Sequence, residues 1–315
     1  MTLQLLVEQY VAFRRTLGER CITNAGILKA FGRTVGPGIA ISEVRAEPVH
    51  AFLQGSGPVT SAWHVRYAAL RGLYHYAITR GYAAESPLPT SVPKRPPSLV
   101  PYIYTREELR RLLAATEATR HPLRRAEPQT LRAILLLLYG AGLRVGEARN
   151  LAREDVDLGS SIATVRDGKF FKSRLVPLAP QLVGALAEYR AWRQAKYPSD
   201  DPKAGFFVGP GGTRLSKAGL DLAFRTARKM AGIRRSGGTS FQPRMHDLRH
   251  TFAVHRLLDW YRQGADVQKL LPHLSVYLGH RRLCHTQVYL TMIPELLEQA
   301  CTRFEQYAQK EVHDG

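Results

Sequence analysis

A run of prolines between residues 87 and 101 most constrains how this chain can fold. Six prolines lie in the stretch PLPTSVPKRPPSLVP. Because proline lacks an N–H donor and has a fixed φ, no helix can pass through such a stretch. The sequence therefore predicts two domains, over residues 1–86 and 104–315, which are joined by a linker over residues 87–103.

The charge of the chain indicates a polyanionic partner. Lys and Arg number 45 against 26 Asp and Glu, a formal net charge of +19, and residues 1–97 alone hold 11 basic and 5 acidic residues. A protein that is basic in both domains is expected to bind nucleic acid. Lys94 and Arg95 make the linker basic too, and an extended basic segment suits a nucleic-acid backbone. A generically basic protein, such as a ribosome-associated factor, is the alternative.

Other features of the composition bear on the cellular setting. The longest apolar run, Ile134 to Leu143, contains two glycines and falls short of the ~20 residues that span a bilayer. The N-terminal residues lack the basic segment of a signal peptide. The three cysteines are odd in number and have no paired spacing, which disfavours a disulfide framework or a CxxC zinc site. We therefore expect no membrane association and a reducing cytoplasm.

The first domain reads as four short helices. An apolar face formed by Leu6, Tyr10, Phe13 and Leu17 predicts the first helix, which ends near Gly18. Three more are expected over residues 23–33, 43–54 and 60–82. The last has an apolar side made of Trp63, Tyr67, Leu70, Leu73, Tyr74 and Ile78. Its opposite side offers three candidate DNA-binding residues, Arg66, Arg71 and Arg80. An ordinary helical bundle with solvated charges remains the alternative.

The second domain is expected to be mainly α with a small β-sheet. Thr105 and Glu108 form the capping box of a first helix, and the apolar segment 130–142 forms another. SIATVR and KFFKSRLVPL flank an Asp167-Gly168 turn and predict a β-hairpin. The remaining elements are expected to be a helix from Pro180, a strand at 205–209, a helix over 216–231, one from His246 to Gly264, and an amphipathic C-terminal helix over 294–309.

The stretch RMHDLRHTFAVH places three histidines at helical spacing. It resembles the H-E-x-x-H zinc helix, but Asp247 is shorter than the required Glu, and Arg249 would put a cation beside the metal. No third ligand is evident downstream, so we expect no metal site. His246 and Arg249 lie at positions i and i+3, which suits two groups that face one phosphate. His250 and His255 are expected to pack or to hydrogen-bond along the helix.

Further candidates for phosphate chemistry are dispersed along the second domain. Arg144 follows YGAGL, Lys169 follows the predicted hairpin turn with Lys172 as a close competitor, His280 follows Leu-Gly, and Tyr289 lies nine residues beyond His280. Taken singly, each has an ordinary structural explanation: a helix-end charge, a solvated lysine or a core tyrosine.

The combination is more specific than its parts. GLRVGEARNL, DGK…LVPL, HDLRHTFA and LGH…TQVY, in this order and spacing, resemble the tyrosine recombinase (phage integrase) family, above all its Xer-type and transposon-encoded members. The similarity spans about residues 105–308. The linker and the helical segment before it resemble that family's core-binding (SAM-like) domain.

The resemblance implies a set of residue roles. Arg144, Lys169, His246, Arg249 and His280 would form the active site, with Tyr289 as nucleophile. The chemistry suits these residue types, because guanidiniums stay charged and match phosphate oxygens. A protonated tyrosine needs a base, for which His246 is the candidate, and the leaving 5′-oxygen needs an acid, for which Lys169 is the candidate. Arg66, Arg71, Arg80, Lys94, Arg95 and Lys172 would contact DNA.

The resemblance also implies a function: site-specific DNA recombination through a 3′-phosphotyrosine, for integration, excision or transposition. It implies no metal, ATP or other cofactor, double-stranded recombination sites as substrate, a homotetramer on DNA, partner recombinases from the same element, and a place at the bacterial nucleoid. The C-terminal stripe of Ile293, Leu296, Leu297, Ala300, Phe304 and Tyr307 would dock on a neighbouring protomer. A type IB topoisomerase and a catalytically silent DNA-binding accessory protein are the alternatives.

One departure from compact family members concerns the segment between Arg249 and His280. It is about two helical turns, ~8 residues, longer, and Pro272 within it predicts a kink or break.

Overall fold

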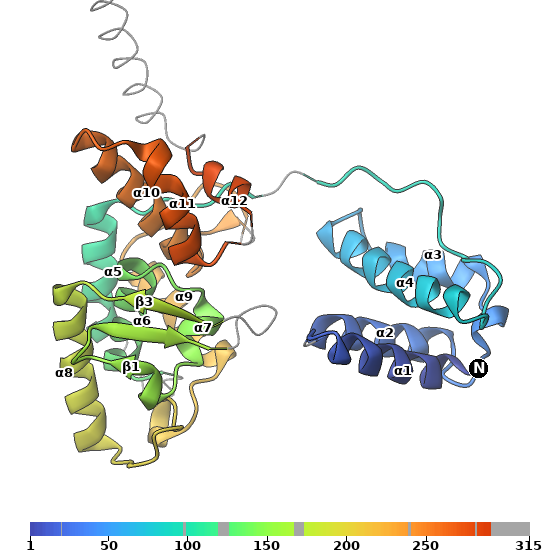
Figure 1. Ribbon diagram of the computed structural model, residues 1–315, viewed down its shortest axis with the longest axis horizontal. Coiled ribbons are helices and arrows are strands. Elements are labelled where there is room, and N and C mark those ends of the chain that lie inside the picture. The colour runs from blue at the N-terminus through green and yellow to red at the C-terminus, as the bar shows by residue number, and fades with distance from the viewer. Residues whose placement is uncertain are drawn as a thin grey trace, which may run out of the picture. The chain divides into compact units, whose positions relative to one another are not determined.

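The computed structural model describes residues 1–19, 21–96, 99–118, 126–166, 173–238, 241–280 and 282–290. It is mostly helical with one small sheet (Figure 1), which confirms the expected fold class. The chain divides into two compact units, one built on Met1–Leu99 and the other on residues that begin at Val100. None of the described helices is long and apolar enough to cross a membrane.

The first unit is a bundle of four helices with a short 3₁₀ turn. Its elements are α1 (Leu3–Thr16), α2 (Ile22–Val35), η1 (Ile41–Glu43), α3 (Ala46–Gln54) and α4 (Ser61–Thr79). The hydroxyl of Thr2 caps α1 by accepting from the backbone N–H of Leu5 at 3.4 Å. Leu6, Leu28 and Leu70 are fully buried in the common core, so each of their helices contributes an apolar face.

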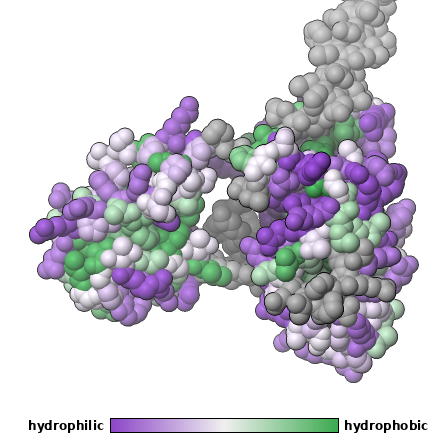
Figure 2. All heavy atoms as spheres, turned by 180° about the vertical axis from the view of Figure 1, so that it is seen from behind, coloured by the Kyte–Doolittle hydropathy of each residue, from purple (hydrophilic) through white to green (hydrophobic). Residues whose placement is uncertain are grey.

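The ends of α1 and α4 depart from the expected burial. Trp63, Leu70, Leu73 and Tyr74 are buried as predicted, but Ile78 is 38% exposed. Phe13 and Leu17, expected on the apolar face of α1, are exposed too. All three lie at or just beyond the last turn of a helix, where the bundle no longer covers them. On the surface, green hydrophobic groups appear among purple hydrophilic ones (Figure 2).

The second unit places helices around a three-stranded antiparallel sheet. The strands are β1 (Val156–Asp157), β2 (Ile162–Val165) and β3 (Arg174–Pro177), in that order, with Ala163 opposite Val176. The helical elements are α5 (Arg106–Ala118), α6 (Pro128–Gly140), α7 (Val145–Arg149), η2 (Arg153–Asp155), α8 (Pro180–Lys196), η3 (Pro210–Gly212), α9 (Lys217–Met230), α10 (Asp247–Arg262), α11 (Val267–Leu278) and α12 (Cys284–Gln287). The apolar helix α6 packs against α5, α8 and α10 at the centre of the core.

Several local predictions can be compared with this unit. The capping box is confirmed, because the N–H of Glu108 donates to Thr105 Oγ1 and the N–H of Thr105 donates to Glu108 Oε2. The strand expected at 205–209 is wrong: Phe206 and Phe207 are buried in a loop that makes only isolated bridges. Pro272 was expected to produce a kink or a break, and the break is wrong, since α11 continues through this residue. The hairpin turn and the C-terminal helix lie outside the described residues.

Candidate active site

The turn between α6 and α7 positions Arg144. Gly142 adopts a left-handed conformation, with φ +61°, and a Cβ there would lie 2.5 Å from Cδ1 of Phe252. Only glycine fits this turn, because any side chain would meet both the strain and the clash. The turn makes Arg144 the N-cap of α7. Its Nη1 donates to Glu147 Oε1 at 2.7 Å, and its Nη2 donates to the carbonyl oxygen of Gly279 at 2.9 Å.

Arg249 is held by the backbone of two turns. It is only 2% exposed. Its Nη1 donates to the carbonyl oxygen of Gly142 at 2.7 Å, and its Nη2 donates to that of Leu278 at 2.5 Å. Burial, followed by the positive charge of Arg144, lowers the pKa of Arg249 to about 10, so the guanidinium stays charged at neutral pH. The turns at residues 142 and 278–279 thus hold both arginines side by side.

Glu147 balances part of this positive charge. Arg174 forms a two-pronged ion pair with it, with Nη1 3.1 Å from Oε1 and Nη2 2.8 Å from Oε2. Burial on its own would raise the pKa of Glu147, but the hydrogen bonds and charge of Arg174, together with Arg144, outweigh it and lower the pKa to about 2. Glu147 is therefore a carboxylate throughout the physiological range.

Sequence reasoning missed Arg174 and Glu147. The reason that Arg174 needs a partner appears only in the structure. In the strand Arg174–Pro177 alternate residues share a face, and Val176 is buried whereas Leu175 is 63% exposed. A basic residue on the buried face of a strand needs a buried partner, and here that partner is Glu147.

Two histidines, His250 and His280, lie beside Tyr289, and His246 packs against His250. Nδ1 of His250 lies 2.9 Å from the phenolic oxygen, and the His246 ring stands edge-on to the His250 ring with centroids 4.9 Å apart. The His280 ring centroid is 6.2 Å from that of Tyr289, and Nδ1 of His280 lies 2.8 Å from Oγ1 of Thr286. Tyr289 itself is 2% exposed.

Burial and the two arginines keep these histidines neutral. Burial, then the charge of His246, lowers the pKa of His250 to about 4. Burial, then the charges of Arg249 and Arg144, lowers the pKa of His280 to about 3. The pKa of His246 is lowered too, first by burial. Burial raises the pKa of Tyr289, although both arginines oppose this. At neutral pH the site therefore combines a protonated phenol with unprotonated imidazoles.

Five of the six residues expected in the active site come together in this way: Arg144, His246, Arg249, His280 and Tyr289. Lys169, and its competitor Lys172, lie outside the described residues. His250, expected to pack or to hydrogen-bond along the helix, instead contacts the phenol of Tyr289. Nδ1 of His255 likewise lies 3.0 Å from the hydroxyl of Tyr139, so its hydrogen bond joins α10 to α6 and does not run along the helix as expected.

The stretch RMHDLRHTFAVH also suggested a zinc site by its spacing. Asp247 is 1% exposed and accepts from the backbone N–H of Arg244 at 2.8 Å and from Nη2 of Arg244 at 2.8 Å. Across the described residues, no three His, Cys, Asp or Glu side chains gather closely enough to hold a metal ion.

The candidate DNA-binding residues of the first unit differ in accessibility. Arg71, Arg80, Lys94 and Arg95 are exposed or half-exposed. Arg66 is half-buried, and its Nη1 donates to the carbonyl oxygen of Phe52 at 3.0 Å near the end of α3. One guanidinium nitrogen of Arg66 is therefore already engaged inside the bundle, which leaves fewer N–H groups of this residue to contact DNA.

Comparisons with known proteins identify the family of the chain. The profile of the Phage integrase family matches residues 103–294. The putative integrase/recombinase y4rB of Sinorhizobium fredii (strain NBRC 101917 / NGR234) is 34% identical over 310 residues, which cover 96% of this chain and 97% of that protein.

Solved structures share the fold. The Tn1549 transposon integrase in complex with transposon right end DNA has a TM-score of 0.68 at 15% identity, over 98% of this chain and 100% of that one. A lambda integrase dimer bound to a COC′ core site has a TM-score of 0.64 at 18% identity, over 92% and 95%. The chain therefore belongs to the phage integrase family of tyrosine recombinases, the enzymes of site-specific DNA recombination.

Proposed function

We propose that this protein cuts and rejoins DNA at specific sites through attack of Tyr289 on a phosphodiester, with a 3′-phosphotyrosine as the intermediate. The observation that carries the proposal is the convergence of Arg144, Arg249 and His280 on the surroundings of one buried tyrosine. Attack on a phosphodiester builds negative charge on the non-bridging oxygens. Fixed donors placed where that charge develops usually contribute more to catalysis than any other single effect.

The tyrosine needs a proton acceptor before it can attack. His250 is in hydrogen-bond contact with the phenol, and its pKa of about 4 leaves it unprotonated at neutral pH. We therefore assign the role of base to His250 in the DNA-free geometry, in place of His246. His246, next to His250 on α10, and His280 would face the phosphate.

The leaving 5′-oxygen needs a proton donor, and Lys169 keeps that role on the strength of the family resemblance. The phosphotyrosine bond conserves the energy of the broken phosphodiester, so rejoining requires neither ATP nor metal. Two guanidiniums supply the charge stabilisation that a metal ion would otherwise provide.

The relatives support a proposal for the biological setting. The Tn1549 integrase is bound to transposon DNA, and lambda integrase is seen as a dimer on a core site and as a tetramer on a Holliday junction. We propose that this chain moves or resolves a mobile element and assembles as a homotetramer on double-stranded recombination sites, together with other recombinases of the same element. It would act at the bacterial nucleoid in the cytoplasm.

A covalent-adduct assay tests the proposal. The full chain is incubated, in buffer that contains EDTA, with nicked duplexes bearing candidate ends from the DNA that flanks its gene. A protein–DNA adduct should appear on a denaturing gel, and Tyr289→Phe should bind the duplex but form no adduct. Binding without any adduct would identify the silent accessory protein. Relaxation of supercoiled DNA without strand exchange between two sites would identify the topoisomerase.

A further inference from the structure

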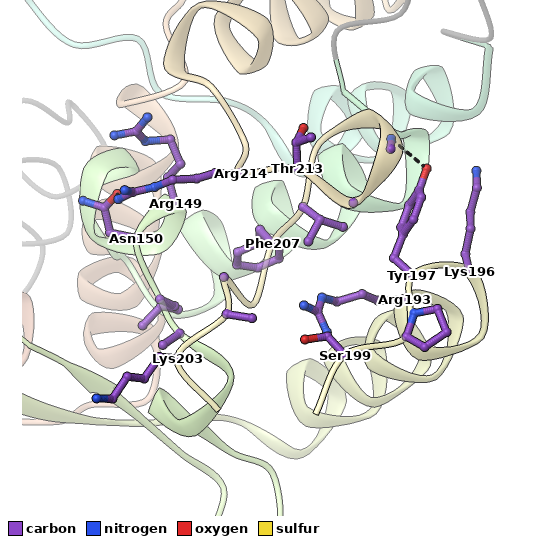
Figure 3. Close-up of a pocket in the computed structure, with 18 residues that line it drawn as sticks. Arg149, Asn150, Arg193, Lys196, Tyr197, Ser199, Lys203, Phe207, Thr213 and Arg214 are labelled. Atoms are coloured by element: carbon purple, nitrogen blue, oxygen red, sulfur yellow. Dashed lines mark hydrogen bonds between the residues drawn. The ribbon is translucent and has the colours of Figure 1, made fainter. Parts of the chain in front are cut away.

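A second concave site lies in the second unit and shares no residue with the active site. It is a pocket of about 580 Å³ formed by the end of α7, the end of α8 and the loop over residues 197–214 (Figure 3). That volume is within the range of roughly 300–1,000 Å³ that is usual for small-molecule sites. Two isolated β-bridges, Ala152 with Gly205 and Val208 with Arg214, hold its walls together.

The lining of the pocket is strongly basic. Its charged residues are Arg149, Arg193, Lys196, Lys203 and Arg214, and no Asp or Glu of the described residues lines it. Within the described part of the chain, only Lys196 has a close counter-ion: its Nζ lies 3.1 Å from Oε2 of Glu127. The pocket therefore keeps an excess of roughly four positive charges over its immediate surroundings, since lysine and arginine remain charged at neutral pH.

Arg193 is the unusual member of this group. It is only 3% exposed, its Nε has no hydrogen-bond partner, and no ion pair joins it to a carboxylate of the described residues. Its side chain extends from α8 toward the middle of the lining residues (Figure 3). A buried cation without a partner is costly, by several kcal/mol in typical proteins. Such a group is retained more readily when an anion supplies the missing partner.

Arg153 adds to the positive potential beside the pocket. Its Nη1 is buried and has no hydrogen-bond partner among the described residues. Burial lowers the pKa of Arg193, and the charge of Arg153 lowers it further, although the nearby phenol of Tyr189 opposes this. Two guanidiniums thus lie near one another with buried donors that no protein acceptor of the described residues satisfies.

We propose that this pocket binds a small molecule that carries several phosphate groups, with Arg193 as the central contact. A single monovalent anion would leave most of the positive charge uncompensated, whereas a triphosphate chain carries about four negative charges at neutral pH. Arginine forks match phosphate oxygens in pairs. Asn150 and Ser199 add neutral donors to the same lining, whereas the hydroxyl of Thr213 donates to the carbonyl oxygen of Pro210 at 3.0 Å. A concave pocket with its key arginine buried suits a small ligand better than a duplex, whose phosphates pass over a surface.

Binding of sodium tripolyphosphate to the full-length protein tests the proposal by titration calorimetry. Three proteins are compared: wild type, Arg193→Met and the control Arg190→Met. Arg190 is exposed, lies one turn earlier on α8 and is not part of the pocket, so the control removes the same charge from the same helix. We expect about one site per chain in wild type, at least tenfold weaker binding in Arg193→Met and less than twofold change in Arg190→Met. Equal affinity for wild type and Arg193→Met would overturn the proposal.

A folding defect can be separated from a binding defect. Methionine removes a buried charge that has no partner, so Arg193→Met is expected to be at least as resistant to urea as wild type. The pair Lys203→Ala with Arg214→Ala provides a second variant, and it should also weaken tripolyphosphate binding. Retention of full affinity by this folded double variant would overturn the assignment of the pocket.

A final comparison tests whether the pocket binds the phosphates of a small molecule or the backbone phosphates of DNA. Affinity for a short duplex is measured at constant ionic strength, because nonspecific DNA binding is dominated by salt-dependent charge. We expect wild type and Arg193→Met to bind the duplex equally. If Arg193→Met loses affinity for the duplex as strongly as for tripolyphosphate, the pocket holds backbone phosphates of DNA, and the small-molecule proposal is wrong.

Discussion

The phenolic oxygen of Tyr289 lies 2.9 Å from Nδ1 of His250. His250 follows Arg249 directly on helix α10. This contact joins a protonated phenol, whose pKa is raised by burial, to an imidazole whose pKa is lowered to about 4 by burial and then by His246. Both shifts oppose transfer of the proton from oxygen to nitrogen in the DNA-free protein. A phosphate brought next to His250 would raise the pKa of the imidazole and make it a better proton acceptor.

His250→Ala should slow cleavage by about 100-fold, because general-base catalysis typically contributes about 10²–10⁴-fold. DNA affinity should be unchanged. Single-turnover adduct formation on a nicked duplex measures the rate. His255→Ala is the matched control, since His255 is another half-buried histidine of α10 that hydrogen-bonds a tyrosine, Tyr139. Similar losses in both variants would mean that His250 acts only through packing.

The depressed pKa values of His250 and His280 predict a loss of stability in mild acid. In the unfolded chain both histidines titrate near the ordinary pKa of 6.5, whereas in the folded protein their pKa values are about 4 and about 3. The unfolded state therefore binds more protons below pH 6.5. Stability is complete above that pH and falls as the pH drops toward 4.

Urea unfolding at pH 7 and pH 5 checks this expectation. Each histidine should contribute a loss of about 1 kcal/mol between the two, after allowance for partial solvent access. In His250→Gln the difference between pH 7 and pH 5 should shrink by about that amount. An unchanged difference in this variant would show that His250 is not responsible.

Gly142→Ala should destabilise the protein by roughly 2 kcal/mol or more, the sum of left-handed strain and overpacking. The added Cβ would meet Phe252 and Leu278, and the shifted carbonyl would leave Nη1 of Arg249 without its acceptor. Cleavage should fall as well. Gly146→Ala is the control: nothing lies within 4 Å of its Cβ position in α7, so it should be neutral or slightly stabilising. Thermal unfolding of both variants decides the matter.

Glu147→Gln should lower the free energy of unfolding at neutral pH by about 3 kcal/mol. The substitution leaves the largely buried guanidinium of Arg174 without its counter-charge. The two residues should also be coupled. In a double-mutant cycle with Arg174→Met, measured by urea unfolding, the interaction energy should lie in the range of about 1–3 kcal/mol for residues in direct contact. Additive effects would show that the ion pair makes no net contribution.

Most helices could be predicted because the residues that mark the ends of a helix lie in the helix itself or next to it. The capping box at Thr105 and Glu108, and the proline at the start of α8, fix element boundaries within a few residues. The apolar pair Phe206 and Phe207 led to the wrong prediction of a strand at 205–209, since a buried loop and a buried strand can have the same composition. Lys169 and the C-terminal docking stripe remain predictions.

The contacts that sequence reasoning missed are long-range. Glu147 and Arg174 are 27 residues apart, and His250 and Tyr289 are 39 residues apart. No periodicity within one helix or strand encodes such pairs. The family resemblance named the proposed catalytic groups, but it did not reveal which buried carboxylate orders them or which histidine contacts Tyr289, the proposed nucleophile.

The two turns that hold Arg144 and Arg249 have a thermodynamic consequence. An arginine side chain loses roughly 2 kcal/mol of rotamer entropy when it is fixed in one orientation. Here the carbonyl oxygens of Gly142, Leu278 and Gly279 fix both guanidiniums in the DNA-free protein. That entropy is therefore lost when the chain folds. In the proposed reaction, the encounter with DNA would not have to supply it.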